Sequence, residues 1–244
     1  MNADVLPQRT AAIVPAAGRG ERLGPGVPKA LRLLGGVPLL VHAVRALAAS
    51  RSVDLVVVAA PPDELAQVRE LLGDHEIGAS VSVVAGAATR TGSVGLALAS
   101  LPPDVDVVLV HDAARPLVPA ELVDAVAAAV RGGADAVVPA IAVADTVKRV
   151  DAAGKDNAET VVETVDRTAL RAVQTPQGFR RDVLVAAYAA DVEEATDDAA
   201  LVERLGVRVL VVRGAEEAFK VTRPLDLWLA EAVLARRRAH GSLP

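Results

Sequence analysis

The chain has 244 residues, no cysteine and a formal net charge of −5, so it can form neither a disulfide nor a cysteine-based zinc site. The acidic balance argues against general nucleic-acid binding, which needs a basic face, although a local group of cations could still bind a small anion. Residues 1–10 lack the apolar core of a signal peptide, and no apolar run approaches the roughly 20 residues of a membrane span. We therefore expect a cytoplasmic protein.

Apolar runs that could form strands recur along the chain, with helical patterns between most of them. The runs are residues 11–14, 55–59, 81–84, 105–110, 136–138 and 207–212. Between them apolar residues recur every three or four positions, as at Leu40, Val44 and Leu47, which is the spacing of one helix face. Strands that are apolar throughout are buried on both faces. The alternation predicts an α/β fold with a mostly parallel sheet sandwiched by helices.

The loop after the first run carries the strongest functional signal. Residues 11–14 lead into Pro15-Ala16-Ala17-Gly18, and the cations Arg22 and Lys29 follow shortly after. Small residues let the backbone approach a ligand closely, and two cations beside such a loop would stabilise a departing pyrophosphate. The spacing fits neither the dinucleotide fingerprint nor a Walker A loop. A tight turn with solvated charges is the alternative, but Lys29 and the small residues favour a nucleotide site.

Two further candidate residues follow strand-like runs. Asp112 comes directly after residues 105–110, at the strand end where ligands bind in open α/β sheets. Its carboxylate could hold Mg²⁺ or accept from sugar hydroxyls, and the alternative is a local turn closed by Arg115. Ser93, in the segment after residues 81–84, could cap the next helix or contact a ligand.

One segment breaks the strand-helix alternation. The β-branched runs 145–150 and 160–166 flank a polar stretch that contains Gly154 and Asn157, which predicts a β-hairpin. An isolated two-stranded ribbon is marginally stable in water, so we expect the hairpin to pack on a partner chain. The alternative is that it folds back over the edge of its own sheet.

The last helix is predicted to begin at Pro224, which suits a first helical turn. Its apolar residues predict one buried stripe, formed by Leu225, Trp228, Leu229, Ala232 and Val233. Lys220 lies just before this helix, where a solvated lysine is the ordinary interpretation.

Several short motifs occur in a fixed order along the chain. They are Pro15-Ala16-Ala17-Gly18-x-Gly20-x-Arg22-Leu23, Pro28-Lys29, Arg90-x-x-Ser93-Val94, His111-Asp112-Ala113-Ala114-Arg115-Pro116, Asp145-Thr146-x-Lys148, Thr164-Val165-Asp166-Arg167, Gln174-Thr175-Pro176-Gln177, Thr196-Asp197 and Lys220-Val221-Thr222-Arg223-Pro224. This ordered set resembles the 2-C-methyl-D-erythritol 4-phosphate cytidylyltransferases. Any one of the motifs is a weak signal, whereas their joint occurrence is highly specific.

The resemblance implies a Rossmann-like nucleotidyltransferase fold in a single domain, residues 1–244, with a β-arm inserted at about 145–167. It implies a homodimer joined by exchanged β-arms and a divalent cation, usually Mg²⁺. The implied reaction joins CTP and methylerythritol phosphate, releasing pyrophosphate and 4-diphosphocytidyl-2-C-methyl-D-erythritol, in non-mevalonate isoprenoid biosynthesis. Neither a nucleic acid nor a membrane is an expected partner.

The resemblance also implies residue roles. Catalytic roles fall to Arg22, Lys29, Arg167 and Lys220. Nucleotide binding falls to Pro15, Ala16, Ala17, Gly18, Gly86, Ala87, Ser93, Asp112 and Ala113. Substrate binding falls to Asp112, Arg115, Thr146, Arg167, Thr175, Thr196 and Lys220. Arg167 would come from the partner subunit, and Asp112 is the candidate metal ligand.

The chain departs from the family pattern at a few positions, and rival functions remain open. Ala87 and Ala88 stand where a glycine and a polar residue are usual, which puts a side-chain contact to the base in doubt. Asp198 stands where a glutamate is more usual, with a small expected consequence. The nearest rival is a ribitol-5-phosphate cytidylyltransferase. A short-chain NAD(P)-dependent oxidoreductase would need a Tyr-x-x-x-Lys pair, which Tyr188 does not provide. A non-catalytic nucleotide-binding module would not explain cations at so many strand ends.

Overall fold

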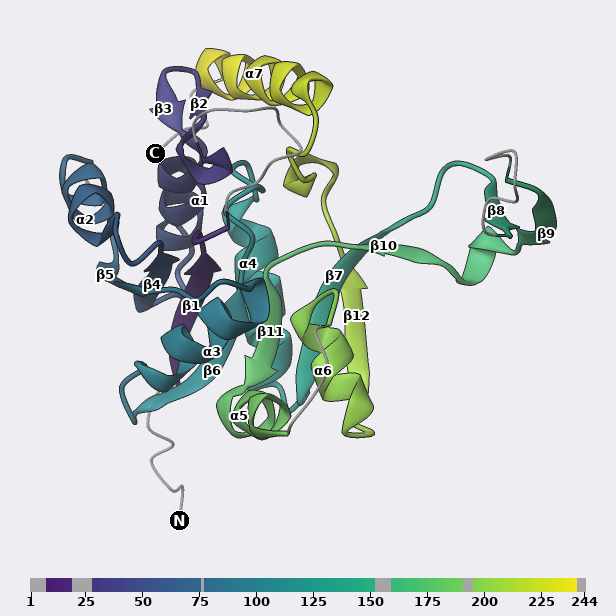
Figure 1. Ribbon diagram of the computed structural model, residues 1–244, viewed down its shortest axis with the longest axis horizontal. Helices are drawn as coiled ribbons and strands as arrows, with labels where there is room; N and C mark the ends of the chain where they lie inside the picture. The colour runs from purple at the N-terminus through teal and green to yellow at the C-terminus, as the bar shows by residue number, and fades with distance from the viewer. Residues whose placement is uncertain (1–7, 19–27, 76, 152–158, 191–194, 241–244) are drawn as a thin grey trace.

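The computed structural model describes residues 8–18, 28–75, 77–151, 159–190 and 195–240. An eight-stranded sheet forms the centre of the molecule (Figure 1). Its strands pair in the order β10-β7-β11-β6-β1-β4-β5. The eighth strand, β12, lies off this path and also pairs with β7. Their bounds are β1 Arg9–Pro15, β4 Leu55–Ala60, β5 Ser80–Ala85, β6 Val105–Val110, β7 Ala136–Ala142, β10 Arg171–Val173, β11 Gln177–Arg180 and β12 Val209–Arg213. The sheet is mostly parallel, as predicted; β10 and β11 run antiparallel to their neighbours.

Helices cover both faces of the sheet. The helices α1 (Leu39–Ala48), α2 (Leu65–Gly73) and α4 (Ala120–Arg131) pack on one face, and α3 (Arg90–Ala99), α5 (Arg181–Ala189) and α6 (Asp198–Arg204) pack on the other. Within β1, Ala12 and Val14 face the first layer while Ala11 and Ile13 face the second. Each buried valine or isoleucine contributes about 1.5–3 kcal/mol, so burial on both faces explains why the strands are apolar throughout. None of the helices in the described ranges is long and apolar enough to cross a membrane.

All six predicted strands form, whereas β10 and β11 were not predicted. β11 reads Gln-Gly-Phe-Arg, of which Phe179 is the one large apolar side chain, and that side chain is fully buried. A Cβ at Gly178 would lie 2.6 Å from Cγ1 of Val126, because α4 packs directly on the strand's backbone. The strand is therefore held by its neighbours β6 and β7 and not by its own hydrophobicity.

The last helix, α7, spans Pro224–Ala239 and begins where predicted, but its predicted buried stripe is wrong. Leu225, Trp228 and Leu229 are 67%, 71% and 52% exposed. The residues that pack are instead Ala230 and Leu234, with Leu227 and Val233 partly buried. The reason is that α7 lies outside the sheet and contacts the small β2–β3 hairpin (Leu33–Leu34 and Val37–Pro38), which covers only a narrow line along the helix.

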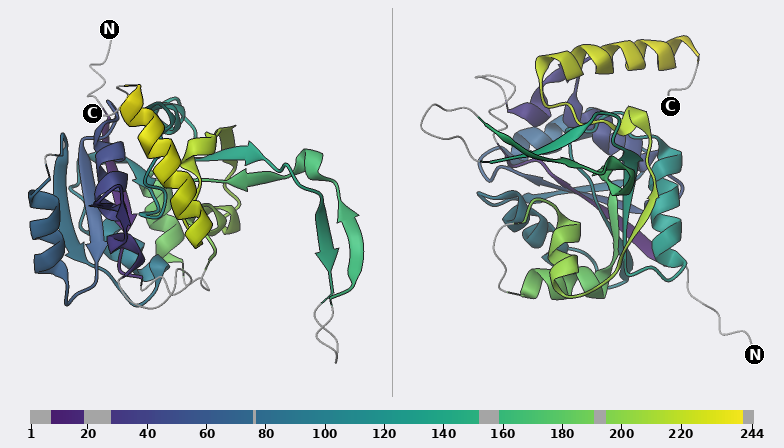
Figure 2. Two further views of the ribbon diagram at one scale, coloured as in Figure 1. Left: turned by 90° about the horizontal axis from the view of Figure 1, so that it is seen from above. Right: turned by 90° about the vertical axis from the view of Figure 1, so that its right-hand side faces the viewer.

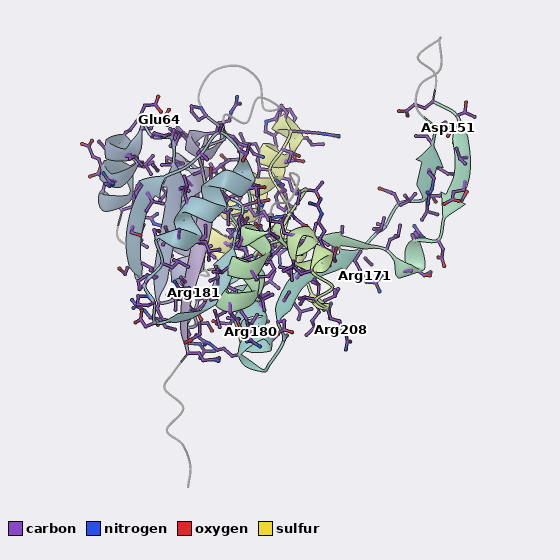
Figure 3. The ribbon with its side chains drawn as sticks, turned by 60° about the horizontal axis from the view of Figure 1, so that its bottom comes forward. Glu64, Asp151, Arg171, Arg180, Arg181 and Arg208 are labelled. Atoms are coloured by element: carbon purple, nitrogen blue, oxygen red, sulfur yellow. The ribbon has the colours of Figure 1, made fainter. Side chains whose placement is uncertain are left out.

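The predicted β-hairpin is present as β8 (Val147–Val150) and β9 (Val161–Val165), which pair antiparallel and form a sheet of their own. The paired strands β7 and β10 carry it away from the body (Figures 1 and 2). In Figure 3, Asp151 marks its far end and Arg171 its root. The alternative, that the hairpin folds back over its own sheet edge, is therefore wrong for this chain.

Candidate active site

The candidate site lies where the strand order of the sheet reverses. From β1 the chain proceeds to β4 and β5 on one side, whereas β6 lies on the other side of β1. Ligands of open α/β sheets bind beyond the carboxyl ends of the strands at such a switch point. The loops there are held by backbone hydrogen bonds: the amide of Ala16 donates to the carbonyl of Ala59 (2.8 Å), and that of His111 donates to Ile13 (2.9 Å).

A pocket of about 260 Å³ opens at this point. Twelve described residues line it: Pro15, Ala16, Ala17, Gly18, Lys29, Ala30, Arg90, Ser93, Asp112, Ala113, Ala114 and Lys220. Nine of the twelve are residues for which the sequence predicted a catalytic or binding role, although they come from five separate segments of the chain. The structure thus brings the predicted nucleotide loop and two of the predicted cations, Lys29 and Lys220, into one cavity.

A close approach of two loops shapes one wall of the pocket. A Cβ at Gly86 would lie 2.6 Å from the Cβ of Ala17, so any side chain there would push the two loops apart. Ser93 is 1% exposed; its hydroxyl accepts from the amide of Ala87 (2.9 Å) and donates to the carbonyl of Thr89 (2.8 Å). The cap of α3 is Thr89 and not Ser93. Ser93 therefore fixes the 86–89 loop beside the pocket.

We expect Gly86→Ala to lower kcat/KM for CTP by roughly 5- to 150-fold, because overpacking of this kind costs about 1–3 kcal/mol and displaces the loop that lines the pocket. Steady-state kinetics with varied CTP measure the effect. The matched control is Gly73→Ala at the end of α2, where an added Cβ meets no atom within 4 Å. Equal kinetics of the two variants would contradict the assignment of this wall.

Asp112 is the electrostatic centre of the site. Its Oδ2 lies 2.7 Å from Nζ of Lys220 and 3.9 Å from Nε of Arg115, and its Oδ1 lies 3.4 Å from Nε of Arg90. Burial alone would raise the pKa of Asp112, but Arg90, Lys220 and Arg115 together lower it well below its usual value. The carboxylate therefore stays ionised and pairs with three cations, of which Arg90 and Lys220 line the pocket.

Two residues that were predicted to bind the substrate form hydrogen bonds within the protein. The Thr175 hydroxyl accepts from the amide of Asp112 (3.0 Å) and lies 3.0 Å from Nδ1 of His111. The guanidinium of Arg115 donates to the carbonyls of Ala218 (2.7 Å) and Val173 (3.3 Å). Both side chains are buried and neither is among the described residues that line the pocket. In this structure Thr175 therefore holds the backbone of Asp112, and Arg115 lies beside its carboxylate.

Because His111 is buried, we expect the protein to become less stable at acidic pH. Burial lowers the pKa of His111 from 6.5 to about 4. As the pH falls, the His111 imidazole is therefore protonated in the unfolded chain before it is protonated in the folded protein. The free energy of unfolding, which has its full value above pH 6.5, decreases as the pH falls toward 4, by up to about 3 kcal/mol. Urea unfolding at pH 7 and pH 5 should show the loss in the native protein and a smaller loss in His111→Gln.

Other predicted residues lie outside the pocket. Thr146 and Arg167 are exposed on the hairpin segment, where the Arg167 guanidinium donates to the carbonyl of Ala144. Thr196 is exposed just before α6. Lys29 opens the short helix η2 (Lys29–Leu31) and lines the pocket, whereas Arg22 lies outside the described residues.

Arg90 is a cation that lines the pocket, although no role was predicted for it from the sequence. It is the first residue of α3, and its guanidinium pairs with Asp112 and with Asp198. Its position in the Arg90-x-x-Ser93 motif was the sequence feature that could have identified it as a site residue. Its partner Asp198 is 108 positions away in the chain, so no local pattern could identify the pair.

Comparisons with known proteins agree with this geometry. The family model described as IspD, 2-C-methyl-D-erythritol 4-phosphate cytidylyltransferase, matches residues 10–236. The chain is 64% identical over 235 residues to the cytidylyltransferase of that name from Streptomyces avermitilis, covering 95% of this chain and 94% of the relative. The corresponding Streptomyces coelicolor protein is 63% identical, covering 96% of this chain and 88% of the relative.

Solved structures give the same result. The crystal structure of 2-C-methyl-D-erythritol 4-phosphate cytidylyltransferase from Thermus thermophilus is 37% identical, with a TM-score of 0.73, covering 94% of this chain and all of that one. The crystal structure of 4-diphosphocytidyl-2C-methyl-D-erythritol synthase from Anaerococcus prevotii is 28% identical, with a TM-score of 0.79, covering 94% of this chain and 97% of that one. The chain belongs to the 2-C-methyl-D-erythritol 4-phosphate cytidylyltransferase family.

Proposed function

We propose that the pocket beyond β1, β5 and β6 is where the chain carries out its family's reaction, the transfer of a cytidylyl group from CTP to 2-C-methyl-D-erythritol 4-phosphate. A phosphate oxygen of the alcohol phosphate attacks the α-phosphorus of CTP in line. The bond from that phosphorus to the β-phosphate oxygen breaks, and its electron pair leaves with pyrophosphate. The observation that carries the proposal is the convergence of a small-residue loop, Lys29, Asp112 and Lys220 on one cavity.

The charges of the site suit two polyanionic reactants. The attacking phosphate is already ionised, so no protein nucleophile or general base is required. Catalysis then depends on alignment and on stabilising charge at the phosphoryl oxygens. Lys29 and Arg22 are proposed to stabilise the transition state, and Lys220 is proposed to hold the incoming phosphate. The backbone of residues 15–18 would face the nucleotide phosphates, and the 86–89 loop fixed by Ser93 would face the cytosine.

A divalent cation is part of the proposal. The described residues contain no cluster of three His, Asp or Glu side chains placed to bind a metal. Asp112 is the one carboxylate among the described pocket residues. Mg²⁺ at phosphoryl-transfer sites is commonly held by one or two carboxylates plus the substrate phosphates. This donor set fits an ion that binds with the triphosphate and takes at most Asp112 from the protein. When bound, the ion would neutralise charge on the triphosphate.

The hairpin is proposed to complete the site of a second subunit. Thr146 precedes β8 and Arg167 follows β9, on the arm that projects away from the body of the molecule (Figures 1 and 2). Val150, Val161 and Val162 on this arm are 41%, 54% and 54% exposed, an apolar surface that a partner chain would cover. A two-fold axis would place each arm over the partner's pocket and give two equal sites. The cytoplasm remains the proposed location.

The deciding experiment is a pyrophosphate-release assay with CTP and either methylerythritol phosphate or ribitol 5-phosphate. We expect turnover with methylerythritol phosphate, loss of turnover on chelation with EDTA, and recovery with added Mg²⁺. A preference for ribitol 5-phosphate would instead support the rival cytidylyltransferase. Absence of pyrophosphate release with both alcohol phosphates, in a folded preparation with Mg²⁺, would overturn the proposed function.

A further inference from the structure

Arg90 bridges two carboxylates at the wall of the pocket. Its Nη2 lies 2.7 Å from Oδ2 of Asp198, and its Nε lies 3.4 Å from Oδ1 of Asp112. Asp112 in turn lies 2.7 Å from Nζ of Lys220. The charges therefore alternate from Asp198 through Arg90 and Asp112 to Lys220. The chain of contacts links helix α6, on the outside of the sheet, to a cation that lines the pocket.

Asp198 is fully buried, and both of its oxygens have partners. Oδ1 accepts from the hydroxyl of Tyr188 at 2.5 Å, while Oδ2 accepts from Arg90. Burial and the neighbouring carboxylate raise the pKa of Tyr188, so its hydroxyl stays protonated and remains a donor. A Cβ at Gly95 of α3 would lie 3.3 Å from the Tyr188 ring, so the ring packs closely on that helix. The pair is rigidly placed between α3, α5 and α6.

We propose that Asp198 and Tyr188 are positioning residues that act through Arg90 on Asp112 and Lys220. This inference rests on the proposed function. Two cations of the pocket lining contact different oxygens of Asp112, Arg90 at Oδ1 and Lys220 at Oδ2. Asp198 holds the Nη2 end of the Arg90 guanidinium at 2.7 Å, so only Nε approaches Asp112, at 3.4 Å. Without the charge of Asp198, the guanidinium is free to turn and bind both oxygens of Asp112 in the bidentate geometry that arginine favours, which displaces Lys220 from Oδ2.

A substitution at Asp198 or Tyr188 should therefore lower the activity of the pocket, although neither side chain is among the described residues that line it. Loss of the Asp198 charge moves Lys220, which is proposed to hold the incoming phosphate. A misplacement of about 1 Å at such a group can cost 100-fold in rate. We therefore expect Asp198→Asn to lower kcat/KM for methylerythritol phosphate by about 10- to 100-fold.

Tyr188→Phe removes one hydrogen bond and keeps the ring, so its effect should be smaller. A typical hydrogen bond corresponds to a change of about 3- to 10-fold, which is the expected loss in kcat/KM. Asp198→Glu keeps the charge and should retain more activity than Asp198→Asn. The structural control is Asp124→Asn on α4. Asp124 accepts hydrogen bonds from Ser50 and Ser52 but is not part of the pocket lining, so this variant should lose thermal stability with native kinetics.

A double-mutant cycle identifies the route of the effect. If Asp198 acts through Arg90, then adding Asp198→Asn to Arg90→Ala should change kcat/KM by less than about twofold, since coupled residues give non-additive effects. All variants are assayed at a temperature where circular dichroism shows them folded. A merely structural Asp198 would lower the melting temperature and leave kcat/KM of the folded enzyme unchanged.

The outcomes separate this inference from the proposed function. No turnover by the native protein defeats the proposed function itself. Native turnover together with unchanged kcat/KM in Asp198→Asn, or with fully additive losses in the cycle, overturns the positioning role. Should Asp198→Asn fail to fold, Tyr188→Phe decides alone, and native kcat/KM in that variant overturns the inference.

Discussion

Replacing Lys29 by alanine is expected to lower kcat by about 100- to 1000-fold while the protein remains folded. Lys29 lines the pocket beside the 15–18 loop, where the proposed mechanism places the negative charge that develops as pyrophosphate leaves. Removal of one donor directed at a transition-state oxyanion costs about 3–4 kcal/mol in comparable sites. The residue lies in the short helix η2 and not in the sheet, so its loss leaves the hydrophobic core unchanged. Arg22→Ala is expected to have an effect of the same size.

The measurement is steady-state pyrophosphate release, with circular dichroism to verify folding. Arg208→Ala is the matched control, because this exposed cation (Figure 3) precedes β12, at the amino ends of the parallel strands, whereas the pocket lies beyond their carboxyl ends. It should retain native kcat. A folded Lys29→Ala protein with native kcat would refute both the role of Lys29 and the placement of the reaction in this pocket.

The fold could be predicted where local pattern decides the structure. The six apolar runs became strands because each is buried between two helical layers, and such burial is visible in the residues themselves. The β8–β9 hairpin is exposed, and it was predictable for a different local reason: its β-branched runs favour strands and pair with each other. β11 and the packed face of α7 depend on surfaces contributed by distant segments, so their sequences carry little sign of them.

The same distinction applies to the site. The 15–18 loop and Asp112 follow apolar strands directly, and the position of a residue after a strand predicts its position at the sheet edge. The Arg90–Asp198 ion pair and the Thr175–Asp112 hydrogen bond join residues 108 and 63 positions apart. Thr175 and Arg115 were expected beside the substrate, and the structure adds their bonds to His111 and to backbone carbonyls. Such contacts become visible only after the sheet has brought the segments together.

A mixture of Arg167→Ala and Lys29→Ala subunits is expected to regain activity that neither variant has alone. In the mixed dimer one site combines an intact Lys29 from one chain with an intact Arg167 from the other, and the opposite site carries both defects. By two-fold symmetry, activity should rise toward about half of the native value per heterodimer. The geometry supports this result, because the arm that carries Arg167 projects away from the body (Figure 1) and Arg167 is not among the described residues that line the pocket.

The measurement is pyrophosphate release before and after subunit exchange, with exchange verified by differently tagged chains. Arg149→Ala provides the control, since Arg149 is an exposed cation of the same hairpin whose ion pair with Glu163 contributes little to stability. That variant should be active by itself, which separates loss of the Arg167 charge from damage to the arm. If exchange is complete and the mixture stays as inactive as its parts, Arg167 acts within its own chain. The arm would then have to bend back over its own pocket in the working enzyme, against the direction in which β7 and β10 carry it.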